Sequence, residues 1–131
     1  MKKLADSGKR KQFSTGAVRD GGTGKGAFHL LPIFGVLAGA LQMERGAAKY
    51  APRNWEKGLP LSTFVNSAIG HILRHTAGFD DEPHLDAAIW NLMCLAETQQ
   101  RIKHGLLPKT LDDLPKTWAG FDWNELLKEL A

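Results

Sequence analysis

The sequence has little of several features that define other classes of protein. Cys94 is its single cysteine, which excludes an intrachain disulfide framework and favours a reducing compartment. The longest apolar run, residues 30–41, contains a proline and two glycines and falls short of the ~20 residues that a membrane span needs. Polar residues follow Met1, so we expect no secretory signal and a cytoplasmic protein.

Strand patterns, internal repeats and coiled-coil heptads are also missing from the sequence. Helical periodicity instead predicts three main helices over residues 32–50, 63–77 and 84–104, and a short helix over residues 123–130. A length of 131 residues indicates one compact domain, which we place at residues 28–131. The predicted fold class is therefore all-α, a helical bundle with a short C-terminal helix.

The same periodicity predicts which helix faces are buried. The expected buried residues are Ile33, Val36, Leu37, Ala40 and Leu41 in the first helix, Phe64, Val65, Ala68, Ile69, Ile72 and Leu73 in the second, and Leu85, Ala88, Ile89, Leu92, Met93 and Ala96 in the third. Cys94 is expected in the same core. Gly35 and Gly39 would allow a close helix crossing, within the chain or between subunits. We expect Ser62 and Asp122 to cap the second and last helices.

Residues 1–27 are rich in glycine and basic residues, and we expect them to form a flexible, irregular arm. The net charge is +3, and the basic excess of this arm suits phosphates or nucleic acid. Its segment GGTGKG, residues 21–26, differs from a true phosphate-binding loop because no apolar strand precedes it and Gly26 replaces the required Ser or Thr. Arg19 and Lys25 could still help it close over a phosphate.

Side chains of the types that bind metals are concentrated between residues 71 and 91 of the sequence. The acidic residues of this segment are Asp80, Asp81, Glu82 and Asp86. Carboxylates this close need counter-charge, and their hard oxygen atoms favour Mg²⁺ or Mn²⁺. The alternative interpretation is a solvated acidic loop that stabilises the N-terminus of the next helix.

The histidines of this region allow more than one interpretation. His71 and His75 share one flank of the predicted second helix, as two metal ligands, two proton-transfer groups or two structural histidines would. Glu44 continues the apolar stripe of the first helix by helical steps, so it faces either the core or, if the stripe drifts, solvent. A structural zinc site would combine His71, His75, His84 and Cys94, but their spacing fits no usual pattern.

Basic, aromatic and amide residues flank this region in the sequence. Cations that could neutralise phosphate oxygens are Lys49, Arg53, Lys57 and Arg74. Tyr50 or Trp55 could stack on a purine base, and Asn54 or Asn91 could read its edge, although each is also an ordinary structural residue. Carboxylates for a metal and cations for phosphate together are what a nucleotide hydrolase needs.

Several segments of the sequence resemble a known family. The segments RDGGTGKG, HLLP, GAAKY, RNW and GFDDEPHLDAAIWNL are similar to those of the phage and bacterial dATP/dGTP diphosphohydrolases, which are MazG-like all-α enzymes. The resemblance covers residues 13–115. The sequence is similar in particular to the phage MazZ enzymes, which remove deoxyguanosine triphosphate during synthesis of 2-aminoadenine DNA. It implies a homo-oligomer, a dimer or tetramer, that hydrolyses dGTP or dATP to the monophosphate and pyrophosphate with two or three Mg²⁺ or Mn²⁺ ions.

The resemblance also implies site residues. MazG-like folds hold metal with an EExxE segment on one helix and ExxD on the next; Asp86 matches the final Asp, Pro83 stands at the Glu of that motif, and His71 and His75 stand where glutamates are expected. The expected catalytic residues are Asp86, Glu82 and His71. The expected metal ligands are Glu44, Asp81, Glu82 and Asp86. The expected substrate-binding residues are Lys25, Lys49, Arg53, Asn54, Trp55, Arg74 and Asn91.

The mechanism implied by this family is attack of a metal-activated water on the α-phosphorus, with lysines and arginines stabilising charge on the phosphates. An HD-type phosphohydrolase would require a His-Asp doublet, which the sequence does not contain. A small basic helical protein with four tryptophans could instead bind nucleic acid, but that alternative leaves the acidic residues 80–86 unexplained. We therefore expect a purine nucleotide, rather than nucleic acid or a membrane, as the partner.

Overall fold

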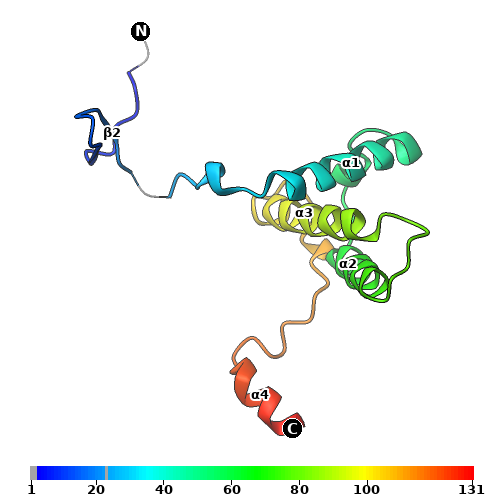
Figure 1. The fold of residues 1–131 in the computed structure, drawn as a ribbon. Helices are drawn as coiled ribbons and strands as arrows, with labels where there is room; N and C mark the ends of the chain where they lie inside the picture. Colours follow the sequence, from blue (N-terminus) through cyan, green and yellow to red (C-terminus); the bar gives the residue numbers. More distant parts are fainter. Residues whose placement is uncertain (1–2, 23) are drawn as a thin grey trace. The chain divides into compact units, whose positions relative to one another are not determined.

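The computed structural model describes residues 3–22 and 24–131, which divide into two compact units on either side of the bond between Pro32 and Ile33. The second unit contains four α-helices and two short 3₁₀ helices (Figure 1). They are α1 (Ile33–Tyr50), η2 (Asn54–Lys57), α2 (Leu61–Thr76), α3 (His84–Lys103), η3 (Lys109–Leu111) and α4 (Trp123–Leu130). The predicted all-α fold class is confirmed. In the part of the chain that is described, no helix has the length and apolar character of a membrane span.

The first unit contains a small hairpin that the sequence analysis did not predict. Strands β1 (Arg10–Gln12) and β2 (Val18–Asp20) pair antiparallel with Arg10 opposite Asp20, and a 3₁₀ helix, η1 (Phe28–Leu30), follows. Each strand has three residues and is almost fully exposed, so no alternation of apolar and polar residues marks it. Periodicity therefore could not reveal these strands.

The Asp20 carboxylate organises the glycine-rich segment that follows this hairpin. Lys25 Nζ donates to Asp20 Oδ2 at 2.7 Å, while the Ser7 hydroxyl and the Gly22 backbone N–H donate to Asp20 Oδ1. These hydrogen bonds, led by that of Lys25, hold the pKa of Asp20 far below its usual range. Gly24 has a φ of +82°, which glycine adopts without strain. The segment thus folds back on its own carboxylate and engages Lys25.

Helix α3 packs against both α1 and α2 in the second unit (Figure 1). The buried apolar residues are Leu61, Phe64 and Ala68 of α2, and Ala87, Ala88, Cys94 and Ile102 of α3. Three polar side chains of α3 are buried with them: His84, Asn91 and Thr98. The expected burial of Cys94 is confirmed, and that burial raises the pKa of its thiol to about 12.

The crossing of α1 and α3 is close at Gly39, the only buried residue of α1. A Cβ atom at this position would lie 2.6 Å from Met93 Sδ and 3.4 Å from Ile89 Cγ2. The prediction of a close crossing at this glycine is confirmed, and the crossing lies within one chain. Glycine is favoured here because a larger residue would displace the Met93 side chain.

The predicted buried stripes are wrong for much of the helix surface. All five predicted α1 residues are exposed, with Ile33 at 72% and Leu41 at 48%. In α2, Ile69, Ile72 and Leu73 are exposed, and in α3 so are Leu85, Leu92, Met93 and Ala96. The reason lies in α3, whose buried face consists largely of small and polar residues at positions 84, 87, 91, 94 and 98. The prediction chose the most apolar face of the helix, which lies next to the face that is buried.

The N-terminus of α2 is capped by a distant residue. The helix begins at Leu61, so Ser62 lies in its first turn and the prediction that Ser62 is the N-cap is wrong. Asp113 supplies the acceptor instead: the Ser62 backbone N–H donates to Asp113 Oδ1 at 2.9 Å, and the Ser62 hydroxyl donates to Oδ2. These bonds lower the pKa of Asp113. The predicted cap of α4 is confirmed, because Asp122 Oδ1 accepts the first free N–H groups of that helix.

Candidate functional site

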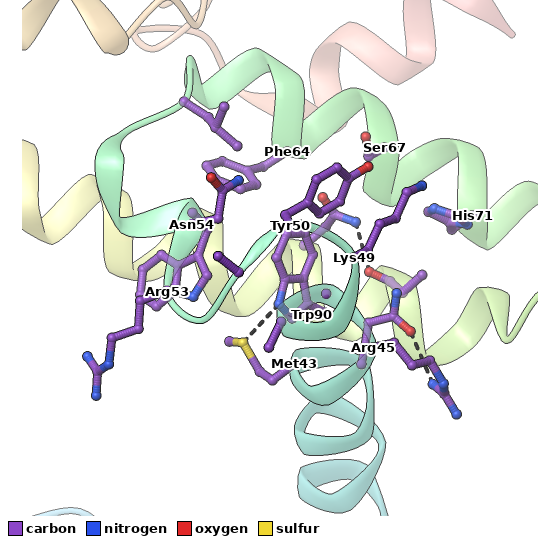
Figure 2. Close-up of a pocket in the computed structure, with 18 of the residues that line it drawn as sticks. Met43, Arg45, Lys49, Tyr50, Arg53, Asn54, Phe64, Ser67, His71 and Trp90 are labelled. Atoms are coloured by element: carbon purple, nitrogen blue, oxygen red, sulfur yellow. Dashed lines mark hydrogen bonds between the residues drawn. The ribbon is translucent and has the colours of Figure 1, made fainter.

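A cavity of about 870 Å³ lies among the C-terminal half of α1, the following turn, α2 and the start of α3 (Figure 2). Its volume is in the range of small-molecule sites, near the upper end. Residues predicted from the sequence line much of it: Lys49, Arg53, Asn54, Trp55, His71, Glu82 and Asn91. These residues are spread over 43 positions of sequence, and the helix packing brings them together.

Aromatic side chains form one part of the cavity wall. The rings of Phe64 and Trp90 meet edge to face, with centroids 6.3 Å apart. Trp90 Nε1 donates to Met43 Sδ at 2.9 Å, which fixes the indole between α1 and α3 (Figure 2). Sequence reasoning considered Trp55 and Tyr50 as base-stacking residues and missed Trp90, although its segment was part of the family resemblance. This wall offers a rigid apolar surface to a planar ligand.

The turn after α1 has an unusual backbone. Ala51 and Arg53 adopt positive φ angles of 114° and 60°, which cost on the order of 1 kcal/mol each in residues other than glycine. Arg53 Nη1 donates to Glu56 Oε1 at 2.5 Å, and the Arg101 guanidinium lies 3.4 Å from the same oxygen and 5.5 Å from the centre of the Trp55 ring. Arg101 was missed because it lies a helix away in the sequence. The Arg101 guanidinium therefore stabilises the position of the Trp55 ring through a cation–π contact, without lining the cavity itself.

The opposite side of the cavity carries charge. Figure 2 shows Lys49, Arg45 and His71 on one side of Trp90 and Asn54 on the other. The Lys49 ammonium lies 5.0 Å from the centre of the Tyr50 ring, and interaction with that side chain is the main cause that raises the pKa of Lys49. Its charge is therefore secure at neutral pH, as phosphate binding requires.

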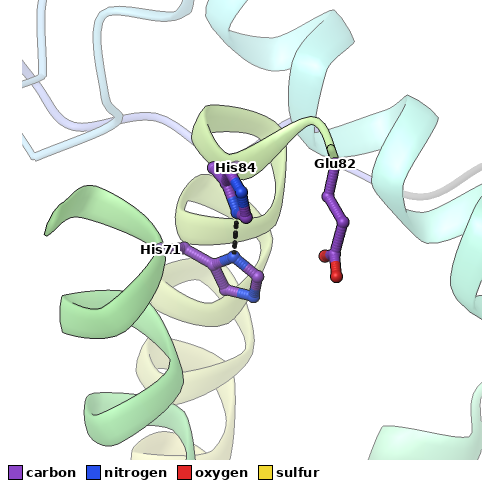
Figure 3. Close-up of side chains that lie close together, drawn as sticks. All are labelled: His71, Glu82 and His84. Carbon is purple, nitrogen blue, oxygen red and sulfur yellow. Dashed lines mark hydrogen bonds between the residues drawn. The ribbon is translucent and has the colours of Figure 1, made fainter. Parts of the chain in front are cut away.

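Two histidines meet at this side of the cavity (Figure 3). His71 Nδ1 and His84 Nδ1 are 2.9 Å apart, and His84 Nε2 is 2.9 Å from Asp81 Oδ1. A carboxylate only accepts hydrogen bonds, so His84 Nε2 carries a proton and, in the neutral pair, His71 Nδ1–H donates to His84 Nδ1. Burial is the main cause that lowers the pKa of His71, and the bond from His84 lowers the pKa of Asp81. His71 Nε2 is thereby left as an unprotonated nitrogen.

Glu82 completes a group of three possible metal ligands. One ring nitrogen from each of His71 and His84 and a Glu82 carboxylate oxygen all lie within 4.8 Å of one another. Glu82 and His71 also line the cavity. His84 was not among the residues predicted for the site, because its approach to His71 depends on the packing of α3 on α2.

The remaining predicted residues lie elsewhere. Asp86 forms an ion pair with Arg45, whose Nη1 is 2.9 Å from Asp86 Oδ2. Glu44 and Arg74 are exposed and do not line the cavity, although the charge of Arg74 contributes to lowering the pKa of His71. Lys25 belongs to the first unit, where it is engaged with Asp20.

A family model described as dATP/dGTP diphosphohydrolase, N-terminal, matches residues 15–106 of this chain. No curated protein and no solved structure matches it. The matched segment contains α1, α2, α3 and every residue that lines the cavity. Because the match extends over most of the chain, the protein belongs to the dATP/dGTP diphosphohydrolase family and is a nucleoside triphosphate diphosphatase.

Proposed function

We propose that the cavity binds a purine deoxynucleoside triphosphate, dGTP or dATP, and that the protein hydrolyses it to the monophosphate and pyrophosphate. The observation that carries the proposal is the division of one cavity into an aromatic wall and a charged side that holds Lys49, His71 and Glu82. A nucleotide has the same division between a planar base and an anionic phosphate chain.

The base is placed against the tryptophans. Trp90 is fixed by its bond to Met43, and Trp55 is supported by Arg101, so both indoles are ready to stack or pack against a purine. Asn91 donates one amide N–H to the Ala87 carbonyl at 2.8 Å. Its side-chain oxygen remains an acceptor for a purine N–H group. The choice between guanine and adenine falls to Asn91 and Asn54.

The phosphates are placed at the charged side. Lys49 lies on this side and stabilises charge on the non-bridging and leaving oxygens, and this is the main contribution a protein makes to phosphoryl transfer. Arg53 lines the cavity on the side of Asn54 (Figure 2) and contacts the phosphate chain only after its ion pair with Glu56 opens. Arg74, which lies outside the cavity but close enough to help lower the pKa of His71, adds to this charge. Arg45 now holds Asp86, and a triphosphate that attracts Arg45 would release the Asp86 carboxylate.

The residues present fit a divalent cation, because Glu82, His71 and the neighbouring Asp81 and Asp86 offer acidic and imidazole ligands beside the phosphate region. When bound, two or three Mg²⁺ or Mn²⁺ ions supply a water of lowered pKa as the nucleophile for the α-phosphorus. Glu82 and Asp86 hold the cation side of the site. His71 contributes an imidazole nitrogen to the same cation side.

A second copy of the chain is part of the proposal. Apolar side chains on three consecutive helices are exposed in the single chain, among them Leu37 of α1, Leu73 of α2 and Leu92 of α3. Exposed apolar surface of this extent is costly in water, and burial between two copies removes the cost. We expect a homodimer or a tetramer, which light scattering during size-exclusion chromatography measures directly.

The test measures monophosphate and pyrophosphate released from dGTP and dATP with Mg²⁺ or Mn²⁺. We expect turnover by the wild-type protein and losses of about 100-fold or more in Glu82→Gln and in Asp86→Ala, as for removal of an electrostatic catalytic group. Asp80→Asn is the matched control, since Asp80 lies in the same acidic segment but is not among the proposed cation ligands. Full activity in both site variants, or a metal-independent gel shift with no hydrolysis, overturns the proposal.

A further inference from the structure

The pair of histidines beside the cavity shares one feature with histidines that bind metals, a carboxylate behind the buried ring. His84 is the first residue of α3 and is only 2% exposed, so its imidazole is almost completely removed from water. Asp81 accepts the Nε2–H of His84 at 2.9 Å. A carboxylate that holds one nitrogen of an imidazole in this way fixes its tautomer and turns the other nitrogen into a ligand.

The free nitrogen of His84 faces a second imidazole. Its Nδ1 lies 2.9 Å from Nδ1 of His71, which is half-buried on α2 (Figure 3). Without a cation, the two lone pairs can face each other only because a single proton lies between them. A divalent cation binds both nitrogens at about 2.0–2.1 Å once the two rings turn so that the ion lies beside the line that joins them, and the proton then moves to Nε2 of His71.

The third ligand is positioned by local backbone structure. Pro83 has φ −74° and ψ 73°, and the His84 N–H donates to the Glu82 carbonyl at 2.8 Å, which is an inverse γ-turn. This tight turn holds Glu82 directly beside His84, and a carboxylate oxygen of Glu82 lies within 4.8 Å of one ring nitrogen of each histidine. Bonds of about 2.0–2.2 Å require a slightly closer approach, which the exposed Glu82 side chain is free to make.

We propose that His71, His84 and Glu82 bind one transition-metal dication, of the class of Zn²⁺, Co²⁺ and Mn²⁺, in preference to Mg²⁺. Imidazole nitrogens favour these ions, whereas Mg²⁺ favours oxygen ligands and keeps its water shell. Asp81 is a positioning residue that acts through His84. The inference deepens the proposed function, because His71 and Glu82 belong to both, and it assigns His84 a role in place of the carboxylates expected from sequence.

The place of these ligands indicates a reactive ion rather than a structural one. Three protein ligands leave a position open to water or to a phosphate oxygen, as in catalytic zinc sites, whereas structural zinc is enclosed by four ligands. His71 and Glu82 line the cavity, so the open position lies on the substrate side. Lys49 lines the same cavity and remains available for the other phosphate oxygens.

The test is a calorimetric titration of the full chain with Zn²⁺ in the absence of nucleotide. We expect one ion per chain, a loss of affinity of at least 100-fold in His84→Gln, and no competition from millimolar Mg²⁺. The matched control is His75→Gln, because His75 lies one turn from His71 on the same helix but outside the group of three. Equal binding by wild type and His84→Gln, or equal displacement by Mg²⁺, overturns the proposal.

Two further variants keep the test decisive if His84→Gln does not fold. Glu82 is exposed, so Glu82→Gln should leave the helical circular dichroism unchanged while weakening Zn²⁺ binding about 100-fold. Asp81→Asn should weaken it about 10- to 100-fold, as loss of a carboxylate behind a ligating histidine does. Nitrogen-15 NMR should show Zn²⁺ shifting Nδ1 of both His71 and His84. Unshifted Nδ1 signals contradict the ligand assignment.

Metal binding and hydrolysis are measured separately, so the two proposals fail separately. Zn²⁺ bound with these variant effects but no pyrophosphate from dGTP or dATP would remove the proposed reaction and leave this site in place. Hydrolysis with Mg²⁺ that is unaffected by His84→Gln, together with no Zn²⁺ binding, would remove this site and leave the reaction.

Discussion

The two units of the chain each contain a carboxylate that accepts hydrogen bonds, and the two carboxylates differ in what their partners do. Asp20 in the first unit binds Lys25, Ser7 and a backbone N–H of its own glycine-rich segment. Asp81 in the second unit binds His84, whose other nitrogen faces His71. The first group satisfies its own members, whereas the second leaves a nitrogen directed at a cavity.

The difference follows from what supports each group. The hairpin that carries Asp20 has two three-residue strands and almost no buried side chain, so its order is local. The group around Asp81 lies where the buried start of α3 packs on α2. Helix packing can hold polar groups with unused hydrogen-bonding capacity, while an exposed loop rearranges until its groups pair. A cluster of polar residues in a sequence therefore indicates a binding site only when packed secondary structure holds those residues in place.

The largest expected effect concerns stability and contrasts one phenylalanine from each unit. Phe64 is 1% exposed in the α2–α3 core, so Phe64→Ala should lower the free energy of unfolding of the helical unit by about 3–5 kcal/mol. Phe13 is 41% exposed, and Phe13→Ala should change it by less than about 0.5 kcal/mol. Urea denaturation followed by circular dichroism at 222 nm measures both. Equal losses would mean that the first unit belongs to the same core.

The next effect contrasts two lysines as phosphate ligands. Lys49 lines the cavity, and Lys49→Ala should raise KM for dGTP about 10- to 100-fold, since a hydrogen bond to a charged group contributes about 1.5–3 kcal/mol. Lys25 must leave Asp20 before it can bind a phosphate, so Lys25→Ala should raise KM less. Steady-state pyrophosphate release gives both values.

A third variant tests the role of Lys25 by freeing this lysine instead of removing it. Asp20→Asn weakens the hold on Lys25, and it should lower KM if Lys25 reaches the substrate. The double variant Asp20→Asn with Lys25→Ala should then lose that gain. A larger KM increase for Lys25→Ala than for Lys49→Ala would place the main phosphate contact in the arm.

A smaller effect is expected at the back of the aromatic wall. Arg101 lies behind Trp55 and beside Glu56, so Arg101→Ala should loosen the indole and weaken nucleotide binding about 3-fold, within the range of a cation–π contact of about 0.5–1 kcal/mol. Arg101→Lys should recover part of the loss. Titration of the intrinsic fluorescence with dGTP measures the change, and an unchanged affinity in Arg101→Ala would separate Trp55 from the binding surface.

The smallest effect is a pH dependence that compares two carboxylates with lowered pKa values, Asp113 of the second unit and Asp20 of the first. A lowered pKa in the folded protein means that the carboxylate stabilises it above the usual Asp pKa and that this contribution disappears as pH falls toward the lowered value. Asp113 caps α2, so Asp113→Asn should reduce the loss of helical stability between pH 5 and pH 2. Asp20→Asn should not affect it. Thermal melts of both variants across this pH range measure the difference.

Sequence reasoning predicted the helices well and their packing poorly. Caps, glycines and prolines mark helix ends locally, so α1, α3 and α4 lie within a residue or two of their predicted bounds. The prediction of the buried faces was wrong because α3 buries Asn91 and Thr98 and leaves Leu92 exposed. Such a choice depends on neighbouring helices and, in our proposal, on a second chain, neither of which periodicity in one sequence records.

The candidate site shows the same limit. Lys49, Asn54 and Trp55 could be predicted because they are close in sequence and chemically suited to nucleotides. His84 and Arg101 could not, because each acts through a contact with a different segment, His71 and Trp55 respectively. A histidine at the first position of a predicted helix, one proline after three acidic residues, is the sequence signal that would have favoured His84.

The reactivity of the single cysteine can be used to measure local opening of the helices. Cys94 is 1% exposed at the centre of α3, and burial raises the pKa of its thiol to about 12, so a thiol-specific dye cannot react with it while α3 stays packed. Each labelling event therefore marks a transient opening of the packing around α3, one of the helices that line the cavity. Labelling rates with and without nucleotide would show how far an occupied cavity slows that opening, with no engineered probe.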